Sequence, residues 1–250
     1  MYTIVLATQK GGSGKSTLAI GLALAAIQAG HTVRLIETDS QGTLQNWQRR
    51  RTAAEPAVES IYVAGNLERR LQSLAGSGVT LTIIDTAGGI SAVTASAIRH
   101  SDLCLIPTRP SVADIEAAAS TLQAARAWKK PFAIVLNQAP IRGQRITNAA
   151  NTLGNSGALD LSGVLAQPFI AMRNDHQDAL SAGLAVSEYA PQSKSTDEVR
   201  SLWQWVEAKL NAGAVNHPAA GGRPASSDIA PSIFLQAPAD APPPASWSGL

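Results

Sequence analysis

The stretch Gln9-Lys10-Gly11-Gly12-Ser13-Gly14-Lys15-Ser16-Thr17 constrains the fold of this chain more than any other part of the sequence. It directly follows the apolar run from Tyr2 to Ala7 and precedes a segment rich in alanine and leucine. A strand, a glycine-rich turn and a helix in this order form a phosphate-binding loop, because glycines let successive backbone N–H groups converge on an anion. The sequence therefore predicts a nucleotide site at this turn.

Each residue type in the loop has a chemical use. Glycines allow backbone angles and close approaches that a Cβ atom would block. Lys15 places a charge where the β- and γ-phosphates would lie, and Ser16 offers a hydroxyl to Mg²⁺. The alternative is a plain strand-to-helix turn with two solvated lysines. The predicted nucleotide ligands are Gly11, Gly12, Ser13, Gly14, Lys15, Ser16 and Thr17.

Two features distinguish this loop from the strict pattern. Gln9 stands where that pattern has a glycine, and a second lysine, Lys10, lies five residues before Lys15. The run Lys-Gly-Gly-x-Gly-Lys-Ser resembles the deviant Walker-A loop of the ParA/MinD superfamily of dimerising ATPases, and Gln9 is more similar to the ParA branch. The resemblance implies ATP and Mg²⁺ as cofactors and a homodimer in the ATP state, in which Lys10 reaches the nucleotide of the partner subunit.

Composition narrows the class of protein. The chain has 250 residues, of which 45% are hydrophobic, enough for one α/β core. A formal net charge of +2 means that any nucleic-acid contact must come from a local basic patch. The single cysteine, Cys104, lies in an apolar run and excludes an iron–sulfur cluster. The longest apolar stretch, Leu18 to Ile27, is too short to span a bilayer, so we expect a cytoplasmic protein.

Apolar runs separated by helical stretches predict the fold class. Continuous apolar strands alternating with helices indicate an α/β protein with a mostly parallel twisted sheet and helices on both faces, as in P-loop NTPases. Ligands of such sheets bind at the carboxyl ends of strands. The predicted strands are Thr3 to Ala7, Val33 to Glu37, Val79 to Asp85, Leu103 to Pro107 and Phe132 to Asn137.

Acidic residues end two of these runs. The segment Glu37-Thr38-Asp39-Ser40-Gln41-Gly42 is similar to the Asp-x-Asp-Pro-Gln-Gly segment of ParA proteins. The resemblance gives Asp39 the role of orienting the attacking water, whereas the alternative is that Asp39 or Ser40 caps the following helix. Asp85 stands where a carboxylate holds a water of the Mg²⁺ shell. The predicted metal site is therefore Ser16, Asp39 and Asp85.

An asparagine and several basic residues complete the predicted site. Asn137 ends its strand with the donor and acceptor pair that an adenine edge requires, although turns also often start with asparagine. The segment from Arg173 to Lys194 resembles the C-terminal signature of ParA proteins. Because the DNA-contacting bases of that family lie in its C-terminal half, the candidates are Arg142, Arg145, Arg173 and Lys194, with ordinary solvated side chains as the alternative.

The C-terminal part divides into a helix and a tail. Val199, Leu202, Trp203, Val206 and Leu210 share one face of a helix predicted over residues 196–210. Its polar face has few basic residues, which favours docking on the sheet over membrane binding. From residue 213 the chain is rich in alanine, proline, glycine and serine. We therefore predict an ATPase domain over residues 1–212 and a disordered tail over residues 213–250.

Taken together, the motifs predict a small ParA-type ATPase without an N-terminal helix-turn-helix domain. Its catalytic residues would be Lys10, Lys15 and Asp39. The resemblance implies that the ATP dimer binds DNA non-specifically on the nucleoid and positions a plasmid, a chromosome region or a protein assembly. A ParB-like or other cargo adaptor would stimulate hydrolysis. The alternatives are a MinD-like membrane-associated switch, a metabolic ligase resembling dethiobiotin synthetase, and a non-hydrolysing scaffold.

Overall fold

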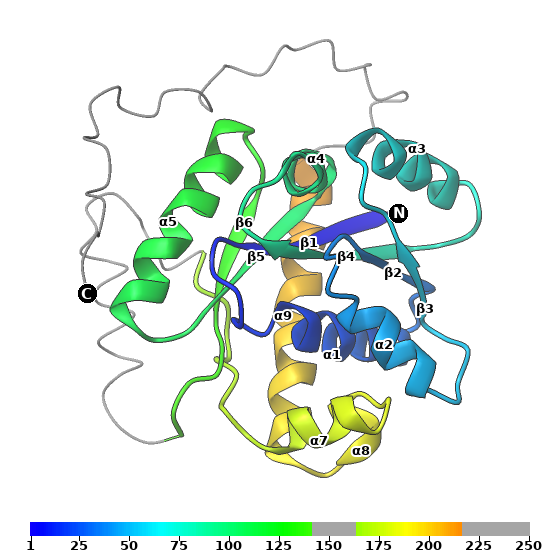
Figure 1. Cartoon of the computed structure of the whole chain (residues 1–250), viewed down its shortest axis with the longest axis vertical. Coiled ribbons are helices and arrows are strands. Elements are labelled where there is room, and N and C mark those ends of the chain that lie inside the picture. The colour runs from blue at the N-terminus through cyan, green and yellow to red at the C-terminus, as the bar shows by residue number, and fades with distance from the viewer. Residues whose placement is uncertain (142–163, 217–250) are drawn as a thin grey trace, which may run out of the picture. The chain divides into compact units, whose positions relative to one another are not determined.

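A computed structural model of the chain describes residues 1–141 and 164–216 (Figure 1). In these residues six parallel strands form one sheet in the order β3-β2-β4-β1-β5-β6. The five predicted strands are confirmed, and the structure adds β3 at the edge. The strands are β1 (Tyr2–Thr8), β2 (Val33–Glu37), β3 (Ala57–Ser60), β4 (Leu81–Gly88), β5 (Leu103–Thr108) and β6 (Phe132–Leu136).

The order of the strands determines where a ligand can bind. β1 lies between β4 and β5, because the chain builds one side of the sheet first and then crosses β1 to build the other. The carboxyl end of β1 therefore lies where the strand order reverses. Open parallel sheets bind their ligands at such a point. The glycine-rich loop follows β1 at this place.

Helices cover both faces of the sheet (Figure 1). Successive residues of β1 point to opposite faces, so Ile4 and Leu6 belong to one core cluster and Val5 and Ala7 to the other. The first face carries α1 (Lys15–Gln28), α2 (Thr43–Arg50), α7 (Asp175–Ser181), α8 (Val186–Tyr189) and α9 (Lys194–Asn216). The second carries α3 (Ala64–Ala75), α4 (Ala92–His100) and α5 (Val112–Ala127).

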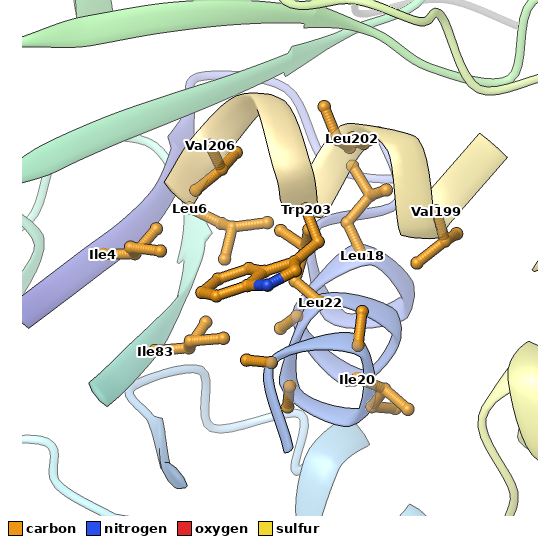
Figure 2. Packing of buried hydrophobic residues seen from close by; sticks show 14 of the residues in the cluster. Ile4, Leu6, Leu18, Ile20, Leu22, Ile83, Val199, Leu202, Trp203 and Val206 are labelled. Atoms are coloured by element: carbon orange, nitrogen blue, oxygen red, sulfur yellow. The ribbon is translucent and has the colours of Figure 1, made fainter. Parts of the chain in front are cut away.

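Helix α9 docks on the core through its apolar face. Trp203 is 2% exposed and lies among side chains of α1, β1 and β4, including Leu22, Ile4 and Ile83 (Figure 2). The predicted docking of this helix is confirmed. In the described part of the chain, no helix is long and apolar enough to cross a membrane. α9 continues to Asn216, beyond the domain limit predicted at residue 212, and residues 217–250 of the predicted tail lie outside the described residues.

The segment around α7 and α8 docks on α2. Arg51, whose side chain is 3% exposed, pairs with Glu188 through two nitrogen–oxygen distances of 2.7 Å and lies 5.0 Å over the Trp47 ring. The Trp47 indole also donates to the carbonyl of Leu184 at 3.1 Å. These contacts fix the helix that follows Asp39 against the C-terminal part of the fold.

Candidate nucleotide-binding site

The glycine-rich loop ends in a helix N-terminus with exposed donors. Gly12 and Gly14 have φ angles of 71° and 84°, and Gly14 is the N-cap of α1 without any side-chain cap. Within the described residues, the N–H groups of Ser13 and Gly14 have no hydrogen-bond acceptor. Unpaired N–H groups at a helix N-terminus bind anions, because the helix dipole adds to their partial positive charges. The conformation therefore fits the predicted phosphate site.

Lys15 lies at the centre of the site. The residue is 7% exposed, and its Nζ lies 3.5 Å from the carbonyl oxygen of Lys10. Burial lowers the pKa of this lysine, while the carboxylates of Asp85 and Asp39 act in the opposite direction. The charges of Lys15, Asp39 and Asp85 are therefore close enough to influence one another.

Asp85, near the end of β4, is fully buried, and among the described residues neither carboxylate oxygen has a hydrogen-bond partner. Burial raises its pKa to about 7, against the opposing effects of the Ser16 hydroxyl and the Lys15 charge. A buried carboxylate without partners is costly unless a ligand completes its interactions. The described residues contain no group of three or more His, Cys, Asp or Glu side chains arranged for a metal. Asp85 and Ser16 thus fit a Mg²⁺ ion bound mainly through phosphates and water.

Asp39 does not cap α2. The N-cap of this helix is Gly42, which has no side-chain cap, and the Oδ1 atom of Asp39 accepts from the N–H of Gln41 at 2.9 Å. Glu37 instead accepts from the N–H groups of Leu44 at 2.7 Å and Gln45 at 3.2 Å. The capping alternative for Asp39 and Ser40 is therefore wrong.

The capping role of Glu37 was not predicted from the sequence. The residue is completely buried, and burial raises its pKa, while the two backbone hydrogen bonds lower it and the Asp39 charge raises it. The signal in the sequence is an acidic residue that ends an apolar strand a few positions before a helix. This arrangement leaves Asp39 partly exposed at the carboxyl edge of the sheet.

Asn137 and Gln138 follow β6 and contact the glycine-rich loop. Asn137 is 4% exposed and its Nδ2 donates to the carbonyl of Ser13 at 2.7 Å. The Nε2 of Gln138 donates to the carbonyl of Gly12 at 3.0 Å. The amide nitrogen of Asn137 is thus engaged with the loop, and its contact with adenine stays a prediction. The sequence contains no signal for the contact of Gln138.

Lys10 is exposed beside the loop, in reach of the charge of Asp114. Burial raises the pKa of Asp114, but hydrogen bonds from Ser111 and Arg109 and the charges of Arg109 and Lys10 lower it overall. The Nε and Nη2 atoms of Arg109 each lie 3.0 Å from the Oδ1 atom of Asp114. The contact of Lys10 with the nucleotide of a second subunit stays a prediction.

The DNA-contact candidates are not brought together as a set. Arg173 pairs with Glu198 at 2.6 Å, and its side chain is 20% exposed, so its charge is already compensated. Lys194 is exposed at the start of α9. Arg142 and Arg145 lie outside the described residues. A DNA contact by any of these residues stays a prediction.

Comparison with known protein families gives a match over the N-terminal part of the chain. The model of the VirC1 protein family matches residues 1–158. Protein VirC1 of Rhizobium radiobacter is 32% identical over 127 residues, which cover 48% of this chain and 54% of that protein. The maintenance of carboxysome distribution protein A of Halothiobacillus neapolitanus is 24% identical over 209 residues, covering 80% of this chain and 94% of the relative.

Solved structures share the fold. An aspartate-to-alanine variant of Cyanothece McdA in complex with ATP has a TM-score of 0.65 and 16% identity, over 84% of this chain and 96% of that one. The septum site-determining protein MinD of Pyrococcus horikoshii, complexed with Mg-ADP, has a TM-score of 0.64 and 17% identity, over 85% and 98%. The whole described core therefore has the architecture of these proteins.

Proposed function

The chain belongs to the VirC1 family, within the ParA branch of the ParA/MinD superfamily of ATPases, and from this premise we propose that it hydrolyses ATP and positions a cargo. One observation carries the proposal: Lys15, Asp39 and Asp85 lie near the carboxyl ends of β1, β2 and β4, which are neighbours in the sheet, and their charges interact. This combination of a lysine and two acids beside a glycine-rich loop suits phosphoryl transfer, which depends on positioning and charge neutralisation.

In this proposal the loop binds the phosphates of ATP. The backbone N–H groups of residues Gly11 to Thr17 and the ammonium of Lys15 contact phosphate oxygens. Ser16 holds Mg²⁺ directly, and Asp85 holds it through water, which completes the unpartnered carboxylate. The bound Mg²⁺ neutralises charge on the phosphate oxygens. The ATP and Mg-ADP complexes of the structural neighbours support this choice of cofactors.

Hydrolysis also requires a positioned water and further positive charge. Asp39 accepts a hydrogen bond from the attacking water and orients it in line with the γ-phosphate. Lys10 of a second copy contributes positive charge at the same phosphates, so a complete site needs two subunits. The exposure of Lys10 supports this role.

The ATP dimer would bind DNA without sequence preference and associate with the nucleoid. An adaptor on the cargo, ParB-like or of another type, would stimulate hydrolysis and release the dimer. The name of the Halothiobacillus relative, which concerns carboxysome distribution, supports positioning of a cargo as the purpose of the cycle. If Lys194 and other basic residues contact DNA phosphates, the affinity for DNA must fall steeply as the salt concentration rises.

Two substitutions test the proposal. Lys15→Ala removes the charge that contacts the phosphates and should abolish ATP binding. Asp39→Ala leaves the phosphate ligands intact but removes the water-orienting carboxylate, so the variant should bind ATP, hydrolyse it about 100-fold more slowly and accumulate as a dimer. Nucleotide titration, phosphate release and light scattering measure these effects. Asp178→Ala, an exposed aspartate on α7, is the matched control.

Several results would contradict the proposal or one part of it. A wild-type protein that stays monomeric and does not bind ATP would exclude the whole cycle. Hydrolysis by Asp39→Ala at the wild-type rate would exclude Asp39 as the water-orienting residue. ATP-dependent binding to vesicles, or phosphoryl transfer that requires a small-molecule substrate, would instead indicate the membrane switch or the metabolic ligase. DNA retention that is equal with ADP and ATP would exclude the nucleoid part of the cycle.

A further inference from the structure

The glycine-rich loop is fixed from outside by two adjacent side chains. The Nε2 of Gln138 donates to the carbonyl of Gly12 at 3.0 Å, and the Nδ2 of Asn137 donates to the carbonyl of Ser13 at 2.7 Å. Both residues directly follow β6, two strands away from the strand that leads into the loop. The two hydrogen bonds join parts of the chain that are more than 120 residues apart in sequence.

These bonds determine the direction of two N–H groups. In a trans peptide the carbonyl and the following N–H point in opposite directions. Because the Gly12 carbonyl points to Gln138, the N–H of Ser13 points away from it. Because the Ser13 carbonyl points to Asn137, the N–H of Gly14 points away from that side chain. Both N–H groups are among those of the loop and the first turn of α1 that have no acceptor within the described residues.

The backbone around these side chains supports a specific role. Gln138 has a φ of 51°, which is uncommon for a residue with a side chain and persists where surrounding contacts compensate for it. A Cβ atom on Gly14 would lie 2.3 Å from the Nδ2 of Asn137, so the loop and the asparagine are in close contact. A peptide group whose carbonyl has no partner can rotate, and its N–H then no longer points toward a bound anion. The two side-chain hydrogen bonds oppose this rotation at the peptides that carry the N–H groups of Ser13 and Gly14.

We propose that Asn137 and Gln138 are positioning residues that orient the Ser13 and Gly14 N–H groups toward the phosphates of the bound nucleotide. The inference rests on the proposed function, because it assigns the means by which the same site binds triphosphate. Neither side chain needs to contact the phosphates. The ligand chemistry that this arrangement recognises is an oligophosphate, independent of the base attached to it.

Gln138→Leu is the sharpest test. The residue is half-buried, so a leucine of similar size fits while the donor is lost. We expect about 5-fold weaker binding of ATP, the effect of about one net hydrogen bond. The binding of inorganic triphosphate should weaken by the same factor, because the substitution affects the binding of phosphates and not of the base. In steady-state kinetics KM should rise by this factor with kcat unchanged. Gln138→Glu, which cannot donate either, should weaken binding at least as much.

Gln123→Leu is the matched control, because Gln123 is exposed on α5 and away from the loop. The melting temperature of Gln138→Leu should fall by no more than about 2–4 °C, the effect of one net hydrogen bond on a chain of this size, which separates positioning from a general effect on folding. Unchanged affinity of Gln138→Leu, or a loss for ATP but not for inorganic triphosphate, would overturn the inference while leaving the ATPase proposal intact. Failure of the wild-type protein to bind ATP would instead overturn the proposed function itself.

Discussion

Gly183 occupies a position that no other residue can take without displacement of the backbone. Its φ is 70°, and a Cβ atom would lie 2.5 Å from the carbonyl carbon of Arg50. Gly30 also has a positive φ, 96°, but no heavy atom of the described residues lies within 4 Å of the position that its Cβ atom would take. A substitution at Gly30 therefore tests backbone strain alone, whereas a substitution at Gly183 tests backbone strain together with a steric clash.

We expect Gly30→Ala to lower the free energy of unfolding by about 1 kcal/mol, the cost of a left-handed residue with a side chain. Gly183→Ala should lower it by about 3 kcal/mol, because the junction between α2 and the segment before α8 must also move apart. Urea unfolding of both variants measures the difference. Equal effects of the two substitutions would show that the junction with Arg50 tolerates a methyl group.

A partly buried histidine predicts a pH dependence of stability. Burial lowers the pKa of His176, with Glu198 and Asp175 acting in the opposite direction and Arg173 in the same direction. Its Nε2 atom is buried and has no hydrogen-bond partner in the part of the chain that the structure describes. The folded state therefore binds a proton less readily than the unfolded state. The stability contributed by this residue is complete above about pH 6.5, the ordinary pKa of histidine, and is lost as pH falls below it through the lowered pKa of the folded state.

His176→Gln removes this titration. The difference in free energy of unfolding between the wild type and the variant should therefore be larger at pH 7.5 than at pH 5.5, as measured by urea titrations at both values. The comparison of the two proteins is needed because the raised pKa values of Glu37 and Asp85 act in the opposite direction on the wild type. Parallel pH profiles would contradict the assignment to His176.

Among the elements, α2 depends most clearly on a residue outside itself. The helix has no side-chain cap of its own, and Glu37 of β2 accepts the N–H groups of its first turn. The glutamate stands where the ParA pattern has an aspartate, and its additional methylene extends the reach of the carboxylate. The residue thus connects the end of β2 to the helix that follows Asp39.

Glu37→Ala should destabilise the protein by about 2 kcal/mol through the loss of both hydrogen bonds to the helix. Glu37→Asp should have nearly the same effect, because the shorter side chain falls short of Leu44 and Gln45. Hydrogen exchange should show faster exchange at these two amides in both variants. Glu116→Ala, at an exposed glutamate of α5, serves as the control. Continued protection of the Leu44 amide in Glu37→Asp would contradict this account.

For the whole molecule, α9 contributes one side of the core through Trp203 (Figure 2). Replacement by alanine should lower the free energy of unfolding by about 4 kcal/mol, because a buried indole is removed from between α1 and the sheet. Gln204→Ala on the exposed side of the same helix should have little effect. Thermal denaturation of both variants tests this. A small effect of Trp203→Ala would show that α9 detaches easily, as a membrane-binding helix must.

Much of the architecture follows from local patterns. The apolar runs predict β1, β2, β4, β5 and β6, since strands buried on both faces must be continuously apolar. β3 has only the short run Ala57-Val58-Glu59-Ser60 and lies at the edge, half-buried, so periodicity does not reveal it. The phosphate loop is equally evident, because its glycines and lysine are contiguous.

The sequence by itself determined the α/β class, the phosphate loop and the strand-end acids, because these depend on neighbouring residues and their local geometry. The tertiary structure alone decided the partners of side chains that meet across the fold. It gave Glu37 rather than Asp39 to the N-terminus of α2, paired Arg173 with Glu198, and brought Gln138 to Gly12. Gln138 and Gly12 are 126 residues apart in the chain, so no spacing in the sequence records their contact, and even the short step from Glu37 to Leu44 depends on how β2 and α2 are placed by the rest of the fold.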